Sequence, residues 1–307
     1  MLDFEGRVAI VTGAGQGMGE AHAKTLAARG ARVIVNDVVQ ANAEAVVKAI
    51  TDAGGTAVVD THDVSTGGSE IVGTALDNFG RLDIVVANAG ILRVGLFGEQ
   101  PLEEFWKVFD VSFKGTVEML HAAWPHLVDS GSGRVILVSS SGLLANPGAS
   151  AYGAAKAALF GLGNTLAMEG DRVGVQVTTI MPTAWTPMTE NAYTDPTILS
   201  TLRDTMGPEY VSGFITWLAH QETTVHGDFF EIGGNHAGRL VLAGLPRVFS
   251  DDASAESWTE HAAALTSDSD DLEQFRITGD QFASEMIASN PAVKDALAGM
   301  NAADLGA

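Results

Sequence analysis

The sequence contains no cysteine, so disulfide bonds and thiolate metal ligands are both excluded. It also lacks an uninterrupted apolar run of about 18 residues, and no membrane-spanning helix is expected. Basic residues are scarce: 17 Lys and Arg stand against 38 Asp and Glu, a formal net charge of −21. A field of that sign repels nucleic-acid phosphates and anionic lipids, so neither is expected as a partner.

Targeting and metal-binding patterns are absent as well. The first residues, MLDFEGRVAIVTG, have no basic segment ahead of a long apolar stretch, and the last residues, DLGA, match no retention or peroxisomal address. We therefore expect a cytoplasmic protein. The histidines show no metal-ligand spacing: His121 and His126, for example, lie too far apart to share one helix face. No metal site is expected.

Short apolar runs of strand length alternate with segments in which apolar residues recur at helical spacing. Continuous apolar strands bounded by helices are typical of a parallel sheet that is covered on both faces. The sequence therefore predicts an α/β fold, a Rossmann-type doubly wound parallel sheet of about seven strands, with its ligand site beyond the carboxyl ends of the strands. The candidate strands are residues 7–12, 31–36, 55–60, 82–88, 133–139, 175–180 and 227–232.

The pattern changes after the last predicted strand. Residues 1–238 carry the strand and helix alternation, whereas residues 239–307 are acidic and alanine-rich, with short helix-like stretches between polar connections. We interpret 239–307 as a helical C-terminal extension that is too short and too polar to be an independent domain. A flexible tail is the alternative.

A glycine-rich turn, VTGAGQGMGE, follows the first predicted strand and precedes a predicted helix. Glycine permits a tight turn and lets the backbone approach a pyrophosphate, while the N-terminus of the following helix attracts the anion. Because strand, turn and helix occur together, this segment predicts a dinucleotide-binding site. Its residues are Gly13, Gly15, Gln16, Gly17, Met18 and Gly19.

Asp37 lies at the end of the second predicted strand. A carboxylate there accepts hydrogen bonds from the ribose hydroxyls of adenosine and repels a 2′-phosphate. Gln16 stands where an arginine or lysine would help to bind such a phosphate. The two residues favour NAD over NADP, although a strand-end aspartate also serves simply to cap the next helix.

The ends of the third and fourth predicted strands carry further motifs. Asp63 and Val64 end the third strand, where the adenine edge of a dinucleotide would lie, and Asn88, Ala89 and Gly90 end the fourth. Since the carboxyl ends of parallel strands meet at one edge of the sheet, we expect these residues beside the same dinucleotide.

The segment ASAYGAAKAAL places Tyr152 and Lys156 four positions apart in a run of small residues. That spacing puts both side chains on one helix face. A charge roughly 5 Å from the phenol, at an effective dielectric of about 20, contributes on the order of 3 kcal/mol. This is roughly 2 pKa units in favour of the phenolate, which would make Tyr152 a usable base. The alternative is a solvated lysine beside an amphipathic tyrosine.

Together these residues resemble the short-chain dehydrogenase/reductase family over about the first 240 residues. The resemblance rests on Thr12-Gly13-x-x-x-Gly17-x-Gly19, Asp63, Asn88-Ala89-Gly90 and Tyr152-x-x-x-Lys156, with Ser139 thirteen residues before the tyrosine. It implies that Ser139 hydrogen-bonds the substrate oxygen, that Tyr152 transfers the proton, and that Lys156 also holds the nicotinamide ribose. It also implies a homodimer or homotetramer, packed across two-fold axes through the Tyr152 helix and a long middle helix over about residues 101–129.

A narrower resemblance covers YGAAKAALFGLGNTLAMEG, MPTAWTPMT and EYVSGFITWLAHQETTVHGDFFEIGG. These segments are similar to the hydroxyacyl-CoA dehydrogenase unit of peroxisomal multifunctional enzyme type 2, also called 17β-hydroxysteroid dehydrogenase type 4. The family usually has Pro-Gly after the sixth strand, and Pro182-Thr183 fits this branch better. Pro182 is expected at the cofactor, and Trp185 and Met188 are candidates for the substrate pocket.

One residue departs from the family pattern. Many members carry an asparagine in a stretch like DVNxxGT, where it helps to hold a water for proton relay, and this sequence reads DVSFKGT with Ser112 in that place. Serine makes fewer hydrogen bonds than an amide. Ser112 is either a relay residue or simply a helix residue packed near the site.

These observations predict an NAD-dependent enzyme that oxidises a secondary alcohol reversibly. The expected substrate is bulky and apolar, either a hydroxysteroid or a 3-hydroxyacyl-CoA. The acidity of the chain disfavours a coenzyme A tail unless Arg93, Lys107 and Arg203 form a local basic patch. The alternatives are a dehydrogenase of smaller secondary or terpene alcohols, a non-catalytic NAD-binding sensor, and a dehydratase or epimerase acting on a nucleotide sugar.

Overall fold

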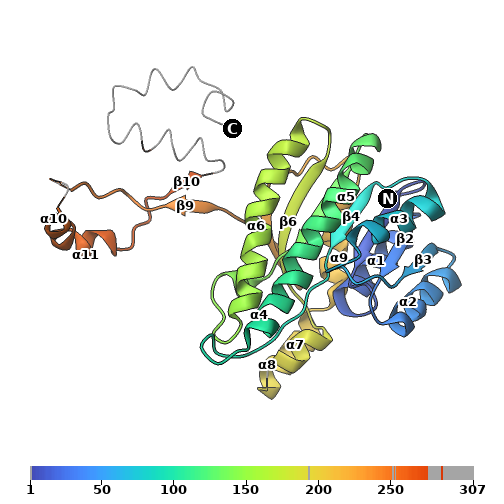
Figure 1. Ribbon diagram of the computed structural model, residues 1–307, viewed down its shortest axis with the longest axis horizontal. Helices are drawn as coiled ribbons and strands as arrows, with labels where there is room; N and C mark the ends of the chain where they lie inside the picture. Colours follow the sequence, from blue (N-terminus) through green and yellow to red (C-terminus); the bar gives the residue numbers. More distant parts are fainter. Residues whose placement is uncertain (1, 193, 251, 253, 276–284, 286–307) are drawn as a thin grey trace. The chain divides into compact units, whose positions relative to one another are not determined.

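The computed structural model describes residues 2–192, 194–250, 252, 254–275 and 285. It divides into two compact units, Met1–Arg239 and Leu240–Ala307 (Figure 1). The sequence prediction for residues 239–307 falls partly outside the described residues, which end at residue 285. That the extension is not an independent domain therefore stays a prediction.

The first unit is built on an eight-stranded sheet with the order β3-β2-β1-β4-β5-β6-β7-β8. Strands β1 to β7 run parallel, with Ile10 of β1, for example, paired with both Ile34 and Val85. The predicted doubly wound α/β fold is confirmed. The parallel strands are β1 (Val8–Thr12), β2 (Arg32–Asn36), β3 (Thr56–Asp60), β4 (Ile84–Ala87), β5 (Arg134–Val138), β6 (Gln176–Thr183) and β7 (Phe229–Gly233).

Strand β8 (His236–Leu240) was not predicted. It follows β7 after the two residues Gly234 and Asn235, a connection short enough only for a hairpin. Gly234 has φ +50°, a conformation that favours glycine at this turn. Most residues of β8 are exposed, so this edge strand lacks the apolar run by which the other strands are identified.

Helices cover both faces of the sheet, as the continuous apolar strands require. One apolar core joins the sheet to α1 (Gly17–Ala27), α2 (Gln40–Asp52) and α9 (Pro208–Ala219). The other joins it to α3 (Gly68–Phe79), α5 (Gly115–Asp129) and α6 (Ser150–Asp171). Figure 1 shows α5 and α6 side by side in front of the sheet.

The predicted middle helix over residues 101–129 has a break in its register. It consists of α4 (Leu102–Phe109), a π-helical turn at Asp110–Lys114, and α5. Gly115 N–H donates to the carbonyl of Asp110, five residues earlier, which closes the turn. Such turns widen a helix locally and occur frequently at functional sites.

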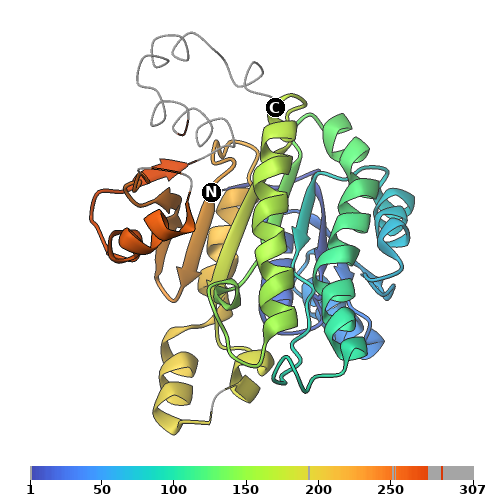
Figure 2. The same cartoon turned by 60° about the vertical axis from the view of Figure 1, so that its left-hand side comes forward.

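The order of strands reverses at β1, which lies between β2 and β4. In doubly wound sheets, a crevice for ligands opens beyond the carboxyl ends of the strands at this point. The carboxyl ends of the strands face the start of α4, the segment between β5 and α6, and the helices α7 (Pro187–Ala192) and α8 (Pro196–Thr205) (Figure 2).

The second unit has little secondary structure in its described part. Strands β9 (Leu242–Gly244) and β10 (Glu273–Phe275) form an antiparallel pair. Between them lie the short helices α10 (Ala255–Glu260) and α11 (Ala262–Leu265). No helix within the described residues of either unit is long and apolar enough to cross a membrane.

Candidate active site

The glycine-rich turn connects β1 to α1, and its geometry depends on glycine. Gly13 and Gly17 both have φ +60°, which L side chains rarely adopt. A Cβ on Gly15 would lie 2.7 Å from Asp37 Oδ2, and a Cβ on Gly19 would meet the carbonyl oxygen of Gly13. The turn is therefore a bare backbone surface at the N-terminus of α1, which fits a pyrophosphate.

Asp37 at the end of β2 closes one side of this turn. Its Oδ2 accepts a hydrogen bond from Gly15 N (3.0 Å), and its Oδ1 accepts one from Val39 N (2.9 Å). The carboxylate is partly exposed, so it is held in place and can still accept further hydrogen bonds from a ligand. Gln16 is exposed at the start of α1, and its side chain makes no capping bond there. Met18 packs partly buried against the core.

The end of β4 is fastened to the end of β1. Asn88 Nδ2 donates to the carbonyl oxygens of Thr12 (2.9 Å) and Gly13 (3.2 Å). In return, Thr12 Oγ1 accepts from the backbone N–H groups of Asn88 (3.1 Å) and Ala89 (3.0 Å). The Asn88 amide thus fixes the glycine turn, and we assign it to positioning rather than to direct ligand contact.

Asp63 and Val64 follow β3 as predicted, but one Asp63 carboxylate oxygen and the Val64 carbonyl already contact neighbouring protein groups. Asp63 Oδ1 accepts from Ser65 N (2.9 Å) and from Ser65 Oγ (2.7 Å). Val64 is buried, and its carbonyl oxygen lies so close to Gly115 that a side chain there would collide with it. The second Asp63 oxygen is exposed beside the carboxyl edge of the sheet, where an adenine contact remains a prediction.

Lys156, on the first turns of α6, is buried beneath Gly90 at the end of β4. Its Nζ donates to the carbonyl oxygen of Val138 (2.7 Å), and burial lowers the pKa of Lys156 to about 8. A Cβ on Gly90 would lie 3.2 Å from Lys156 Nζ and 3.4 Å from Ser112 Oγ. Glycine at this position therefore lets the end of β4 pack closely against the ammonium and the serine hydroxyl.

Ser112 belongs to the π-helical turn and is fully buried. Its Oγ accepts a hydrogen bond from Ile91 N (3.3 Å), directly after Gly90. The structure thus places both Ser112 and Lys156 against Gly90. A relay role for its hydroxyl stays a prediction.

Tyr152 lies on the same face of α6 as Lys156, and Lys156 Nζ is 5.7 Å from the centroid of the tyrosine ring. Burial raises the pKa of Tyr152, and a hydrogen bond with the Ser140 side chain opposes that rise. In the protein without a bound cofactor, the prediction that the lysine lowers the pKa of Tyr152 is wrong. The ammonium is directed at the Val138 carbonyl, and the cost of burying a phenolate outweighs its field.

The predicted catalytic serine, Ser139, does not face Tyr152 in this structure. Ser139 is buried, and its Oγ donates to the backbone carbonyl of Lys156 (2.7 Å), pointing into the packing between β5 and α6. The next residue, Ser140, carries the hydroxyl that reaches Tyr152. Side chains alternate between the two sides of an extended chain, so adjacent serines at the end of β5 face opposite ways.

Two glycines allow this approach of Ser140 to Tyr152. A Cβ on Gly142 would lie 3.0 Å from Cδ1 of the Tyr152 ring, and a Cβ on Gly153 would lie 2.9 Å from the carbonyl oxygen of Gly142. Ser140 Oγ also accepts from Gly142 N (3.2 Å). Neither glycine was expected at the site from the sequence, where their only signal is the lack of side chains on the segments flanking Tyr152.

The segment after β6 lies over the glycine turn. Pro182 is in β6 opposite Ile232, and Trp185 N donates to the carbonyl of Met206 (2.6 Å), which ties the start of the segment to its end. Met188 is 39% exposed. Thr186, which sequence reasoning missed, would be 3.4 Å from a Cβ on Gly17, so any group bound at that turn meets Thr186.

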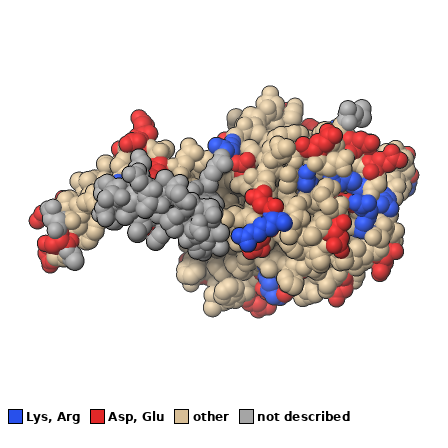
Figure 3. Space-filling model, turned by 90° about the horizontal axis from the view of Figure 1, so that it is seen from above, with Lys and Arg blue, Asp and Glu red and all other residues tan. Residues whose placement is uncertain are grey.

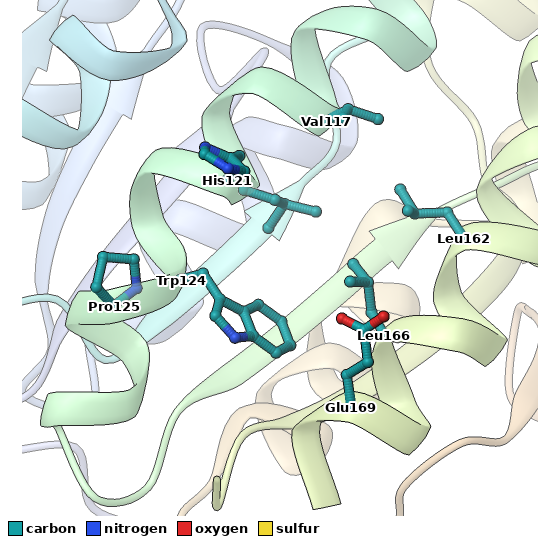
Figure 4. A pocket seen from close by; sticks show the side chains of 8 residues that line it. Val117, His121, Trp124, Pro125, Leu162, Leu166 and Glu169 are labelled. Carbon is teal, nitrogen blue, oxygen red and sulfur yellow. The ribbon is translucent and has the colours of Figure 1, made fainter. Parts of the chain in front are cut away.

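A separate apolar pocket of about 410 Å³ lies between α5 and α6, away from Tyr152 (Figure 4). Figure 4 shows His121, Trp124 and Pro125 on α5 facing Leu162, Leu166 and Glu169 on α6. None of the candidate catalytic, cofactor or substrate residues lines it. Within the described residues, no three His, Asp or Glu side chains are grouped as metal ligands would be.

Comparisons with known proteins agree with this geometry. Residues 7–197 match the family model described as short chain dehydrogenase. Mouse peroxisomal multifunctional enzyme type 2 is 39% identical over 249 residues, which are 78% of this chain and 33% of that protein. The chain spans less than two thirds of the length of the multifunctional enzymes that it matches.

Two solved structures are similar. A short chain dehydrogenase from Mycobacterium avium superimposes with a TM-score of 0.76 at 35% identity, over 86% of this chain and 96% of that one. A 7α-hydroxysteroid dehydrogenase, complexed with NADH and 7-oxo glycochenodeoxycholic acid, gives 0.70 at 25% identity, over 76% and 94%.

Proposed function

The chain belongs to the short chain dehydrogenase family, and from that premise we propose that it oxidises a secondary alcohol to a ketone, reversibly, with NAD. The resemblance to the family and to its multifunctional enzyme type 2 branch is confirmed by the matches. The protein is thus an oxidoreductase that uses a nicotinamide cofactor. The identity of the cofactor, the substrate and the residue roles are our proposals.

The observation that carries the proposal is the arrangement of Tyr152, Ser140 and Lys156 at the carboxyl edge of the sheet, the edge at which the glycine turn also lies. Tyr152 takes the hydroxyl proton from the alcohol in oxidation and returns it in reduction. Ser140 hydrogen-bonds the substrate oxygen, in the role first expected of Ser139. When bound, NAD supplies the acceptor for the hydride of the carbinol carbon.

Lys156 is proposed to act through its charge and its hydrogen bonds. Its pKa of about 8 leaves it mostly protonated at neutral pH, close enough to favour the Tyr152 phenolate once a further positive charge is bound nearby. Packed against Gly90 at the end of β4, it is also proposed to hold a cofactor ribose. Ser112 is proposed to assist proton relay from the buried side of Lys156.

NAD is proposed over NADP because of Asp37. The carboxylate is held over the turn by Gly15 N, and no Lys or Arg occupies residues 13–19 to bind a 2′-phosphate. The partly exposed Asp37 oxygens suit ribose hydroxyls as hydrogen-bond donors. Pro182 and Thr186 are proposed to border the nicotinamide end of the cofactor.

The proposed substrate is bulky and apolar, a hydroxysteroid or a 3-hydroxyacyl thioester. Proteins similar to this chain include a peroxisomal multifunctional enzyme type 2 and a 7α-hydroxysteroid dehydrogenase, and their names support this substrate class. Trp185 and the exposed Met188 are proposed to line the substrate side. Dehydrogenation of a smaller secondary or terpene alcohol is the alternative, and a non-catalytic NAD sensor is less consistent with an intact proton-transfer set.

A homodimer or homotetramer is also proposed. The apolar pocket between α5 and α6 supports it, because an apolar helix face of this kind is suited to packing against a second copy. A cytoplasmic location remains a prediction from the sequence.

Reduction of NAD, followed by absorbance, with a panel of alcohols tests the proposal. We expect turnover of a hydroxysteroid or a 3-hydroxyacyl thioester, and a kcat/KM with NAD at least tenfold above that with NADP. Failure of every alcohol, with NAD still bound, would favour the sensor. Faster turnover of small or terpene alcohols would favour the alternative substrate class.

A further inference from the structure

A buried polar network lies at the carboxyl ends of β2 and β3. Asn36 and Asp60 end the two strands as partners in the parallel ladder, and they are only 2% and 3% exposed. Asn36 Nδ2 donates to Asp60 Oδ1 (2.7 Å) and to the backbone carbonyl of His62 (2.9 Å). Neither Asn36 nor Asp60 was expected at the site from the sequence, and the proposed mechanism uses neither.

Donors surround the Asp60 carboxylate. Besides Asn36 Nδ2, its Oδ1 accepts from His62 N (3.2 Å), and its Oδ2 accepts from His62 Nδ1 (2.9 Å) and from Thr74 Oγ1 on α3 (2.6 Å). An ionised carboxylate has about four lone-pair sites for hydrogen bonds, and donors are present for all of them. The carboxylate is therefore held at once from β2, from α3 and from the loop that follows β3.

Asp83, a buried aspartate at the opposite edge of the sheet, is held differently. Figure 3 views the molecule from that end, at which α5 and α6 finish, and shows Lys and Arg interspersed with Asp and Glu over the first unit. Arg81 Nη2 lies 2.5 Å from Asp83 Oδ1, so a cation pairs with the buried charge. Asp60 has no Lys or Arg partner in the described part of the chain. Because a buried carboxylate without a cation adds little net stability, its place at the carboxyl edge indicates a role there.

Strand β3 lies at the edge of the sheet, with β2 as its neighbour. The ladder between them ends with Asp37 N donating to the carbonyl of Asp60 (3.0 Å). Beyond that bond, the Asn36 amide reaches across to the carbonyl of His62, the residue before Asp63. The Asn36 side chain thus continues the connection between β2 and β3 past the end of the backbone ladder, up to the segment that carries Asp63.

Asn36 also holds the glycine turn, through its backbone. Its carbonyl accepts from Ala14 N (2.8 Å), while the carboxylate of the next residue, Asp37, accepts from Gly15 N (3.0 Å). One residue thus joins the turn to the buried network. A displacement of Asn36 would move the turn, Asp37 and the Asp63 segment together, which are the parts assigned above to the adenosine diphosphate half of NAD.

Resting on the proposed function, we propose that Asn36 and Asp60 are positioning residues for the adenosine diphosphate half of NAD. Neither contacts the cofactor, and together they hold the Asp37 carboxylate and the Asp63 segment in the arrangement that binds it. A carboxylate that is already fixed loses little conformational freedom when ribose hydroxyls bind to it, which raises affinity. Its charge also stays where a 2′-phosphate would lie, which excludes NADP. Loosening the pair should therefore weaken NAD and admit NADP.

Asn36→Ala tests the inference, because it removes both side-chain bonds and keeps the backbone bond to Ala14 N. We expect Kd for NAD and for ADP-ribose, measured by titration calorimetry, to rise about tenfold. The ratio of kcat/KM with NAD to that with NADP should fall several-fold, whereas kcat at saturating NAD should stay within about twofold of wild type. This separation of binding from turnover distinguishes positioning of the cofactor from a general loss of structure.

Two substitutions of Asp60 separate its hydrogen bonds from its charge. Asp60→Ala removes every acceptor and should weaken NAD as much as Asn36→Ala does. Asp60→Asn keeps an oxygen for Asn36 Nδ2 and turns its amide N–H toward Thr74 Oγ1, which can accept, so Kd for NAD should stay within about threefold of wild type. Equal loss of NAD binding in both variants would assign the effect to the charge of Asp60 and overturn positioning by hydrogen bonds.

Thr216→Ala is the matched control for loss of a buried hydrogen bond. Thr216 is 1% exposed on α9, and its Oγ1 donates to the carbonyl of Ser212 (2.7 Å). The substitution should lower the denaturant midpoint without changing Kd for NAD. If Asn36→Ala does not fold, Thr74→Val takes its place: this isosteric change removes one donor from Asp60 and should raise Kd for NAD about threefold.

The outcomes separate the inference from the proposed function. An Asn36→Ala variant, or Thr74→Val in its place, that unfolds more easily yet binds NAD and discriminates against NADP as the wild type does would overturn the inference and leave the proposed dehydrogenase standing. A wild-type protein that binds no NAD, or that oxidises no alcohol with it, contradicts the proposed function itself.

Discussion

The two edges of the parallel sheet use polar residues in opposite ways. At the amino edge, Arg134 is 4% exposed and donates to five backbone carbonyls, those of Ser132, Gly133, His220, Gln221 and Thr223. Burial and the neighbouring Arg7 guanidinium lower the pKa of Arg134 to about 10. Asp83, fully buried beside Arg7, accepts from Val8 N (2.9 Å) and pairs with Arg81.

At the carboxyl edge, the polar groups beside Tyr152 and at the glycine turn have fewer partners. Lys156 Nζ donates to the Val138 carbonyl (2.7 Å), although an ammonium has three hydrogens to donate. The glycine turn presents bare backbone, and Asp37 keeps an exposed side. At the amino edge Arg134 uses its donors on backbone carbonyls, although Nε and Nη1 of the neighbouring buried Arg7 have no hydrogen-bond partner among the described residues. At the carboxyl edge, hydrogen-bonding groups stay available to a ligand. The amino edge therefore serves stability and the carboxyl edge serves chemistry.

Among the variants at the carboxyl edge, Tyr152→Phe should have the largest effect on catalysis. Removing the hydroxyl removes the proton-transfer group, so kcat should fall by about 10³- to 10⁴-fold. The folded protein buries a neutral phenol whose pKa is raised by burial, so loss of its hydroxyl should change the free energy of unfolding little. Steady-state kinetics, denaturant unfolding and NAD titration measure the three quantities. Loss of NAD binding in step with kcat would show that Tyr152 holds the structure rather than the chemistry.

Arg134→Met, at the amino edge, should lower stability rather than catalysis. Five carbonyls lose their shared donor, and we expect the free energy of unfolding to fall by about 3 kcal/mol, with kcat/KM at 25 °C within twofold of wild type. The exposed Arg172→Met at the end of α6 is the control, expected to change stability by less than about 0.5 kcal/mol. An Arg134→Met variant that is stable but inactive would contradict the division between the two edges.

Ser139 and Ser140 allow a comparison between two adjacent hydroxyl groups, of which one makes a buried structural hydrogen bond and the other faces Tyr152. Ser140→Ala removes the donor to the substrate oxygen and should lower kcat/KM by about 10²-fold. Ser139→Ala removes a buried bond to the Lys156 carbonyl and should cost about 1 kcal/mol of stability with little loss of kcat. Both quantities are measured on both variants. The opposite assignment of the two effects would restore Ser139 as the catalytic serine.

His22 affects stability alone, through pH. It is fully buried between α1 and α9, its Nδ1 lies 2.8 Å from Ser212 Oγ, and burial lowers its pKa to about 3 from 6.5. Below pH 6.5 His22 binds a proton in the unfolded chain but stays neutral in the folded protein. The free energy of unfolding therefore falls as pH falls below 6.5, by about 1.4 kcal/mol per pH unit at most.

His22→Asn, which retains a donor near the Nδ1 position, should remove that slope between about pH 6.5 and 5 without moving the pH profile of kcat. Denaturant unfolding at a series of pH values measures it, and the exposed His236→Asn is the control. A slope that survives in His22→Asn would assign the acid sensitivity to carboxylates instead.

The strands and the glycine turn could be predicted because each has a recognisable local sequence pattern. Continuous apolar runs indicate buried parallel strands, and glycines between a strand and a helix indicate a phosphate turn. Tyr152 and Lys156 share a helix face by spacing alone. Asp37 is recognisable because its strand ends directly before it.

The remainder depends on tertiary structure. Three consecutive serines, Ser139 to Ser141, are equivalent in sequence, and only the path of the chain after β5 decides which one meets Tyr152. The π-helical turn around Ser112 has no composition of its own. Thr186 reaches Gly17 because the segment after β6 folds back over the turn, and no local pattern encodes that approach.

Deuterium transfer tests most directly whether the carboxyl edge moves a hydride between an alcohol and nicotinamide. A secondary alcohol that the protein oxidises is labelled with deuterium on its carbinol carbon and incubated with NAD in ordinary water. We predict reduced cofactor that carries the deuterium by mass spectrometry, and almost none from the Tyr152→Phe variant. Reduced cofactor without the label, or labelled cofactor formed equally fast by Tyr152→Phe, would contradict the proposed chemistry.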